Sequence, residues 1–217
     1  MTDDGAPVRR QPAPEAIRNG RVIAIARGLD PSRLVDIAGA LVDGGIQAFE
    51  VTLNSASALN GIAAVRAAFG ADRLLVGAGT VMDIAAAEAA VDAGAAFLVA
   101  PDTNVHLVAW AVERAVPVFP GAITPTEILA AWRAGATAVK VFPASAVGPA
   151  FVRELRGPLP EIPLIPTGGV TADSAPDFIR AGAFAVGLGS WLTGAGDPAT
   201  IRTRATELTD AIRRVSV

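Results

Sequence analysis

The sequence predicts an α/β fold, a single (β/α)8 TIM barrel, and three observations support this. Short apolar segments alternate with alanine-rich helical segments from residue 22 onward, which is typical of βα units on a parallel sheet. Eight such units follow one another in just over 200 residues, a length that suits a small barrel. The chain has 217 residues, 52% of them hydrophobic, so one large domain accounts for it without a second.

Each apolar segment is expected to form one strand that is followed by a helix of ordinary length. The expected strands are residues 22–27, 48–53, 74–80, 97–101, 117–123, 138–144, 163–168 and 185–190. A doubly wound open sheet is the alternative, but no Gly-x-Gly-x-x-Gly motif opens the first unit. Residues 1–16 are expected to be a flexible N-terminal tail, and residues 17–217 to be the barrel domain.

Composition excludes several classes of protein. The formal net charge is −3 with both signs interspersed, so the chain lacks the basic stripe that nucleic-acid binding requires. It has no cysteine and one histidine, which excludes disulfides and thiolate metal sites and disfavours histidine-rich ones. The longest uncharged stretch, residues 181–196, is too short and too glycine-rich to span a membrane. The acidic N-terminus does not resemble a secretory signal, so we expect a cytoplasmic protein.

Lys140 is the only lysine, since the other 17 of the 18 basic residues are arginine. It lies between Val139 and Val141 in an apolar segment. An ammonium group in an apolar site can lose its proton and attack a carbonyl to form an imine, whereas a guanidinium group is effectively never deprotonated. A lysine whose charged end reaches solvent from a strand end is the ordinary alternative. The valine neighbours and the rarity of lysine favour a chemical role.

A short glycine pattern recurs before the second, fourth, sixth and eighth expected strands. Its last glycine, in each case a candidate left-handed helix cap, is Gly45, Gly94, Gly135 and Gly182 in turn. Five residues beyond these caps stand Glu50, Val99, Lys140 and Gly187. Alternate strands supply one interior layer of a barrel, so the four residues are expected to share a layer unless the pattern is coincidental. Glu50 and Lys140 would then meet inside the barrel, where a buried carboxylate and amine are unfavourable unless paired or used.

Further motifs stand at the carboxyl ends of the expected strands. They are Arg27-Gly28, Glu50-Val51-Thr52-Leu53-Asn54-Ser55, Gly77-Ala78-Gly79-Thr80, Pro120-Gly121, Lys140-Val141-Phe142-Pro143, Pro166-Thr167-Gly168-Gly169-Val170 and Gly187-Leu188-Gly189-Ser190. With these motifs in this order, the chain resembles the 2-keto-3-deoxy-6-phosphogluconate aldolase family, which includes phosphogalactonate and 4-hydroxy-2-oxoglutarate members. The resemblance covers residues 20–215. It implies a class I pyruvate aldolase on a (β/α)8 barrel, commonly a homotrimer, that uses a lysine imine and needs no metal or other cofactor.

The resemblance also implies roles for individual residues. Lys140 would form the Schiff base, and Glu50 would shuttle protons during carbinolamine formation, dehydration and deprotonation at C3. The backbone of Gly79 and the hydroxyl of Thr80 would bind the pyruvoyl carboxylate. Phe142 would flank the imine.

Other residues at the strand ends fit the resemblance less uniformly. Pro101 would help to close the pocket. Leu53-Asn54-Ser55 resembles the galactonate-type sequence, because the gluconate-type enzymes have an arginine at the position of Asn54. Arg27 is therefore left as the cation for the substrate. Thr167, by contrast, is the gluconate-type residue at a position associated with stereoselectivity at C4. The motifs are mixed, so the preferred epimer stays open.

A phosphate site is expected where two glycine-rich turns follow the last two strands. Gly168 and Gly169 follow the seventh strand, and Gly189 and Ser190 follow the eighth. Barrels frequently bind phosphate at this place through backbone N–H groups and a helix N-terminus, and glycine permits the close approach. Ser190 would add a hydroxyl donor.

The expected reaction is reversible cleavage of a 2-keto-3-deoxy-6-phospho sugar acid to pyruvate and D-glyceraldehyde 3-phosphate. One alternative is a 4-hydroxy-2-oxoglutarate aldolase that gives pyruvate and glyoxylate. Another is a non-catalytic phospho-ligand-binding barrel in which Lys140 only pairs with a phosphate. The expected partners are therefore small molecules and further copies of the chain, with no nucleic acid and no membrane.

Overall fold

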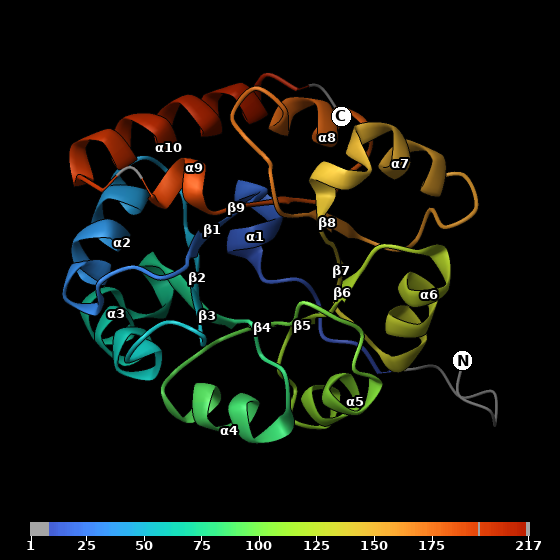
Figure 1. Ribbon diagram of the computed structural model, residues 1–217, viewed down its shortest axis with the longest axis horizontal. Coiled ribbons are helices and arrows are strands. Elements are labelled where there is room, and N and C mark those ends of the chain that lie inside the picture. The colour runs from blue at the N-terminus through green and yellow to red at the C-terminus, as the bar shows by residue number, and fades with distance from the viewer. Residues whose placement is uncertain (1–8, 195, 216–217) are drawn as a thin grey trace.

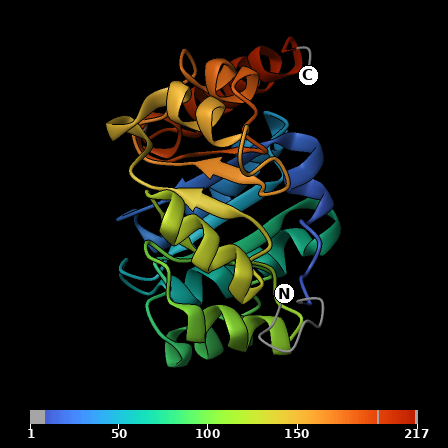
Figure 2. The same cartoon turned by 90° about the vertical axis from the view of Figure 1, so that its right-hand side faces the viewer.

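The computed structural model describes residues 9–194 and 196–215 and shows an α/β fold. Parallel strands form a curled sheet that lies inside a ring of helices (Figure 1). The strands are β1 (Val22–Ala26), β2 (Ala48–Thr52), β3 (Leu75–Gly79), β4 (Leu98–Val99), β5 (Val118–Phe119), β6 (Gly121–Ala122), β7 (Val139–Val141), β8 (Leu164–Pro166) and β9 (Val186–Leu188). In the view turned by 90°, the helices again lie outside the strands (Figure 2).

The helices alternate with the strands along the chain, as the sequence predicts. The α-helices are α1 (Glu15–Gly20), α2 (Leu34–Asp43), α3 (Ala58–Arg73), α4 (Ile84–Asp92), α5 (Val105–Glu113), α6 (Pro125–Ala134), α7 (Gly148–Leu155), α8 (Ala175–Arg180), α9 (Ser190–Thr193) and α10 (Pro198–Arg213). Two short 3₁₀ helices, η1 (Pro31–Arg33) and η2 (Ala144–Ala146), follow β1 and β7. The expected glycine caps are confirmed as left-handed, with φ of 87° at Gly45, 100° at Gly94, 106° at Gly135 and 97° at Gly182.

The strands pair in chain order. One sheet has the order β5-β4-β3-β2-β1-β9, the other has the order β6-β7-β8, and every pair is parallel. A parallel bridge between Thr167 and Gly187 links the end of β8 to β9. Because β1 pairs with both β2 and β9, the order differs from that of a doubly wound sheet, which reverses at a switch point.

Three expectations about the elements need correction. The strand expected at 117–123 is divided into β5 and β6 around Pro120, which has no N–H group for the ladder. The other strands are present but shorter at their ends, for example where Gly28 turns the chain out of β1 with a φ of 64°. Ser190 was expected to end the last strand, but it begins α9.

Two apolar clusters hold the fold together. The larger lies between the sheet and the surrounding helices. The smaller fills the inside of the curled sheet, where the rings of Phe97 and Phe119 pack 5.7 Å apart. Helix α1 contributes the fully buried Ile17 to this inner cluster. Strands buried on both faces explain why their sequences are almost continuously apolar.

Part of the N-terminal segment, which was expected to be a flexible tail, makes contacts with the rest of the fold. Residues 1–8 of that tail lie outside the described residues, but α1 begins at Glu15. Arg10 stacks on the ring of Trp132, with 3.3 Å between its guanidinium carbon and the ring centroid. It also donates hydrogen bonds to the carbonyls of Trp132 (2.6 Å) and Ala136 (2.7 Å) at the end of α6. A cation at the C-terminus of a helix is favourably placed, so Arg10 stabilises the packing of this segment against the end of α6.

Candidate active site

Glu50 is a buried acid inside the sheet. It lies in the middle of β2 with 1% of its surface exposed, and its Oε1 has no hydrogen-bond partner among the described residues. Burial raises the pKa of Glu50, while the positive charges of Lys140 and Arg27 oppose that rise. A buried carboxyl group without a fixed partner is poised to take up and release protons.

Lys140 is a buried amine on β7, with 3% of its surface exposed. Its Nζ lies 4.8 Å from the ring centroid of the half-buried Phe142. Burial lowers the pKa of Lys140, Glu50 raises it, and Arg27 lowers it further. The lowered pKa increases the neutral, nucleophilic fraction of the amine. Within the described part of the chain, Lys140 and Glu50 act on each other through charge without a direct ion pair.

The other two residues that the glycine pattern singled out are also buried. Val99 is 2% exposed on β4, and Gly187 is buried on β9. Val99 belongs, together with Phe97 and Phe119, to the apolar cluster that fills the inside of the curled sheet. The amine and the carboxyl group therefore lie inside a curled sheet whose interior is otherwise largely apolar.

Three other predicted residues follow the ends of strands. Arg27 is exposed and follows β1 directly. Thr80 is half-buried after β3 and has a left-handed backbone with a φ of 57°. Pro101 is half-buried after β4, and its carbonyl lies so close to Gly121 that a side chain there would overlap with it. Gly79, buried at the end of β3, accepts a hydrogen bond on its carbonyl from the Leu53 N–H (2.8 Å).

The structure also brings the two glycine-rich turns together. Thr167 is 6% exposed, and its bridge to β9 sets the turn after β8 beside the turn after β9. Gly168 and Gly169 have φ of 90° and 78°. Gly189 precedes α9, and Ser190 is the exposed first residue of that helix.

Sequence reasoning missed two residues beside the site. Thr52 is fully buried two residues beyond Glu50, on the same face of β2, and Ser55 lies in the turn that follows. Their hydroxyl oxygens are 3.0 Å apart. The sequence contains a signal for Thr52, because a polar residue at a spacing of two from a buried acid points to the same interior face. It contains none for Ser55, whose Oγ accepts a hydrogen bond from the Gly28 N–H (2.9 Å) in the segment after β1.

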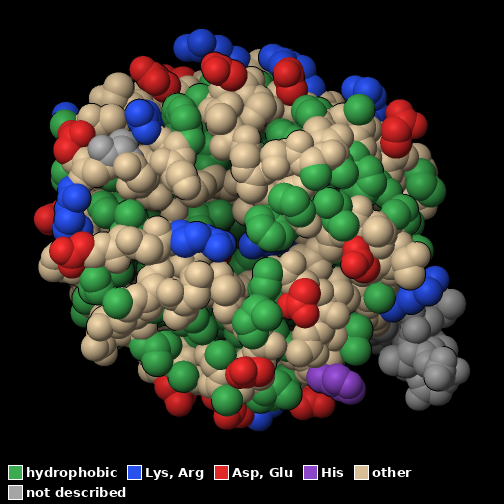
Figure 3. Space-filling view, in the orientation of Figure 1, with side chains coloured by type: hydrophobic (Ala, Val, Ile, Leu, Met, Phe, Trp, Pro, Cys, Tyr) green, Lys and Arg blue, Asp and Glu red, His purple; other side chains and the backbone are tan. Residues whose placement is uncertain are grey.

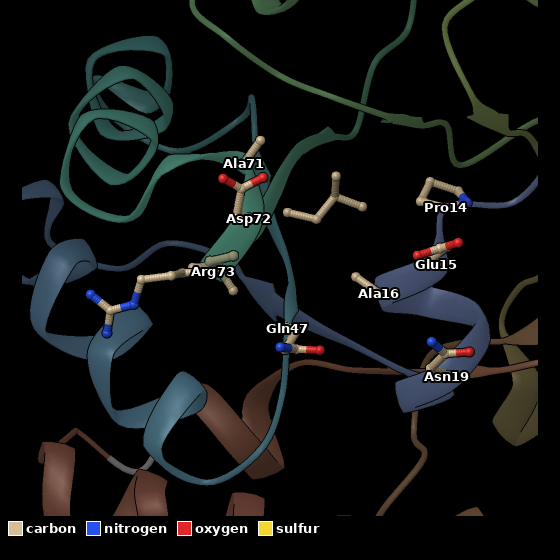
Figure 4. A pocket seen from close by; sticks show the side chains of 10 residues that line it. Pro14, Glu15, Ala16, Asn19, Gln47, Ala71, Asp72 and Arg73 are labelled. Carbon is tan, nitrogen blue, oxygen red and sulfur yellow. The ribbon is translucent and has the colours of Figure 1, made fainter.

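The face seen down the ring of helices is hollowed near its centre, and Lys and Arg side chains gather at this hollow (Figure 3). A separate cavity of about 380 Å³ lies between α1 and the start of β3. Its lining includes Glu15, Asn19, Gln47 and Asp72, and it contains none of the predicted site residues (Figure 4). The predicted site residues therefore lie inside the sheet and at the strand ends, and not in this cavity.

Two features are absent from the described part of the chain. Over residues 9–194 and 196–215, no group of three His, Cys, Asp or Glu side chains is arranged to hold a metal ion. In the same ranges no helix has the length and apolar character needed to cross a membrane.

A buried amine whose pKa is lowered, near a buried carboxyl group inside the parallel sheet of an α/β fold, is the arrangement that an enzyme acting on carbonyl compounds through an imine requires. The model of the KDPG and KHG aldolase family matches residues 14–203, and the chain belongs to this family. It is 39% identical over 176 residues to the 2-dehydro-3-deoxy-6-phosphogalactonate aldolase of Escherichia coli, covering 81% of this chain and 85% of that one. It is 38% identical to the 2-dehydro-3-deoxy-phosphogluconate aldolase of Pseudomonas aeruginosa, covering 79% of this chain and 76% of that one.

Solved structures agree with the family. A native KDPGal structure has a TM-score of 0.85 and 36% identity, covering 89% of this chain and 95% of that chain. The KDPG aldolase of Legionella pneumophila, with pyruvate captured as a covalent carbinolamine intermediate, has a TM-score of 0.77 and 26% identity. That match covers 93% of this chain and 97% of that chain.

Proposed function

We propose that the protein cleaves a 2-keto-3-deoxy-6-phospho sugar acid reversibly to pyruvate and D-glyceraldehyde 3-phosphate. The observation that carries this is the burial of Lys140 and Glu50, each of which shifts the pKa of the other, with a Glu50 carboxyl oxygen that has no hydrogen-bond partner among the described residues. Relatives named for the phosphogalactonate and phosphogluconate compounds match at nearly equal identity, so the proposal covers both epimers.

In this mechanism the neutral amine of Lys140 attacks the C2 carbonyl of the substrate. The resulting carbinolamine loses water to form an imine, which accepts the electron pair of the C3–C4 bond as the C4 hydroxyl loses its proton. The aldehyde leaves, the enamine is protonated at C3, and water releases pyruvate and the free amine. Glu50 carries protons in the formation of the carbinolamine, in its dehydration and at C3, for which a raised pKa is suited.

We propose that the remaining predicted residues orient the substrate. Arg27, the backbone of Gly79 and the hydroxyl of Thr80 would bind the pyruvoyl carboxylate beside the imine. Phe142 would flank the imine, and Pro101 would close the wall. Their positions after β1, β3, β7 and β4 around the buried amine support this assignment.

The same proposal places the phosphate at the two turns after β8 and β9. Thr167 would lie near C4, while Gly168 and Gly169 would offer backbone N–H groups together with Gly189 and Ser190. The left-handed conformations of Gly168 and Gly169 support it, because successive N–H groups in such turns form concave anion sites.

We further propose that the strands close into an eight-stranded barrel within one domain, residues 17–217, with β5 and β6 as one interrupted strand. The Ala100 N–H donates to the Phe119 carbonyl (3.2 Å) on one side of this strand, and the Lys140 N–H donates to the Pro120 carbonyl (2.9 Å) on the other. The bridge between β8 and β9 supplies the remaining connection.

The strand register supports closure. Followed along the pairings, the residue of β4 level with Glu50 is Phe97, two residues before Val99. The same step of two residues recurs from Val99 to Lys140, from Lys140 to Gly187, and from Gly187 back to Glu50. Four steps of two residues add up to the shear of eight that a (β/α)8 barrel requires.

We propose a homotrimer as the assembly. Exposed apolar side chains gather on the segments that begin α3, α4 and α5, and they are Leu59, Met82, Ile84 and Val105. Exposed apolar side chains favour contact between subunits, and the number of three copies follows the family resemblance. Light scattering of the purified protein measures the number of copies directly. The cytoplasmic location remains a prediction that cell fractionation tests.

The activity is tested by pyruvate release from the 6-phosphorylated substrates of both epimers and from 4-hydroxy-2-oxoglutarate. The proposal expects release from at least one phosphorylated substrate at a much higher kcat/KM than from 4-hydroxy-2-oxoglutarate. A relative named KHG/KDPG aldolase, 30% identical, makes the latter compound the second candidate. Release from none of the three would leave the non-catalytic binding protein as the interpretation.

A further inference from the structure

Arg27 stands between two peptide groups that are both held by side chains from the end of β2. The Ala26 carbonyl accepts a hydrogen bond from Thr52 Oγ1 (3.1 Å), and the Gly28 N–H donates to Ser55 Oγ (2.9 Å). The guanidinium of Arg27 has no hydrogen-bond or ion-pair partner in the part of the chain that the structure describes. The position of the Arg27 side chain therefore depends on the conformation of the Arg27 backbone.

The hydrogen bonds around Arg27 have a fixed direction. A hydroxyl group has one proton to donate. Because Thr52 gives its proton to the Ala26 carbonyl, the 3.0 Å bond between the two hydroxyls uses the proton of Ser55. Ser55 Oγ is then free to accept from the Gly28 N–H. The chain runs from Gly28 through Ser55 and Thr52 to Ala26, and every member is satisfied.

We propose that Ser55 is a positioning residue, which holds the peptide after Arg27 and so keeps its guanidinium directed at the buried Glu50–Lys140 pair. Ser55 is half-buried in a turn, outside the core of the sheet. The inference rests on the proposed function, in which Arg27 binds the carboxylate of the substrate. It adds a residue whose hydroxyl acts on the reaction without touching the reacting atoms.

The charge of Arg27 reaches both reacting groups, which gives the proposal a second readout. Arg27, which follows β1, and Glu50, on β2, are the charged groups that act on Lys140. Arg27 lowers the pKa of Lys140 and the pKa of Glu50. If the guanidinium moves away, both pKa values rise, so less free amine and less carboxylate are present at low pH. The acidic limb of the pH profile, where the rate of imine formation falls as the two groups become protonated, must then move to higher pH.

The test compares S55A with wild type, with S55T, which keeps a hydroxyl, and with the matched control S57A. Ser57 is exposed in the same turn, and its hydroxyl has no partner among the described residues. For S55A we expect the KM for the phosphorylated substrate to rise ~3- to 10-fold while kcat stays nearly unchanged. The reason is that the lost hydrogen bond supports binding of the substrate and of the transition state equally. In S55A, the acidic limb of the pH profile for borohydride trapping of pyruvate should also move to higher pH. S55T should restore the KM and the pH profile, and S57A should match wild type in both.

The double variant R27A/S55A decides whether Ser55 acts through Arg27. If it does, S55A has no further effect on KM or on the pH profile once the guanidinium is gone. Effects that add in the double variant, or an S55A profile identical to that of S57A, would overturn the positioning role while leaving the aldolase intact. Absence of a trapped adduct in the wild type would instead overturn the proposed function and this inference with it.

Discussion

Gly79 lacks a side chain where the Glu50 carboxyl group needs the space. A Cβ atom on Gly79 would overlap with Oε1 of Glu50 and would also crowd its Cδ and Cγ, at 2.7 Å from Cγ. The two residues lie on neighbouring strands, and Gly79 is level with Thr52, the next residue on the same face as Glu50. The absence of a side chain at Gly79 therefore allows the Glu50 carboxyl group to occupy its position, in addition to the backbone role that the family resemblance implies.

Replacing Gly79 by alanine should displace Glu50 and lower kcat strongly while Lys140 remains able to react. We expect a loss of kcat on the order of 10²-fold, comparable to losing a general acid–base. Steady-state pyruvate release measures it. A Cβ atom on Gly20, at the end of α1, would meet nothing within 4 Å, so G20A is the control and should keep wild-type kcat. Equal kcat in both variants would contradict the steric account.

Replacing Glu50 by glutamine should leave a lysine that still forms an adduct but should slow the exchange of methyl protons of bound pyruvate. The expected factor is on the order of 10² or more, because the amide cannot accept a proton. Proton exchange into pyruvate in deuterated water, followed by NMR, measures this step apart from bond cleavage. Exchange at the wild-type rate would remove Glu50 from the mechanism.

The sequence predicts that Glu50 and Lys140 are both buried because each stands five residues beyond a glycine helix cap, at the same position of its βα unit. The caps at Gly45 and Gly135 are left-handed, and both side chains five residues on are buried. Contacts that cross between units could not be predicted in this way. The bond from Gly28 to Ser55 and the stacking of Arg10 on Trp132 depend on turn conformations and on segments that meet only in the folded chain.

The phosphate site predicts a preference for phosphorylated substrates that depends on Ser190. If the two turns bind phosphate, that remote group helps to position the reacting carbons, so kcat/KM should fall sharply for the unphosphorylated analogue. S190A should narrow this preference modestly, by ~3- to 10-fold. Proton exchange into pyruvate, which has no phosphate, should barely change in S190A. Equal kcat/KM for the two wild-type substrates would reject the site.

A negative charge at Gly169 should nearly abolish the same preference by repelling the phosphate. Position 169 is tight, since a Cβ atom would lie 2.6 Å from the Cβ of Ser145, and its φ is 78°. G169A therefore serves as the control for backbone and packing strain, and G169D should lose much more kcat/KM for the phosphorylated substrate than G169A. Similar losses in both would assign the effect to packing.

The buried pair should destabilise the fold that contains it. Burial raises the pKa of Glu50 and lowers the pKa of Lys140, so both charged forms are disfavoured in the folded state. Replacing both groups in E50L/K140M should increase the free energy of unfolding by ~1–4 kcal/mol, as for other buried pairs replaced by apolar groups of similar volume. The lowered lysine pKa also means that wild-type stability rises with pH between the folded and the unfolded lysine pKa, and the double variant should lose that slope. Denaturant unfolding across pH measures both effects, and a less stable double variant would contradict them.

The central claim is that Lys140 forms an imine with pyruvate, and borohydride trapping tests it most directly. Intact mass after reduction should show one added pyruvate, less the one water molecule lost on imine formation and plus the two hydrogens gained on reduction, and peptide mapping should place it on Lys140. K140R keeps the charge and approximate size but removes the nucleophile, so it should fold and give no adduct. An adduct in folded K140R, or no adduct in the wild type, would contradict the account.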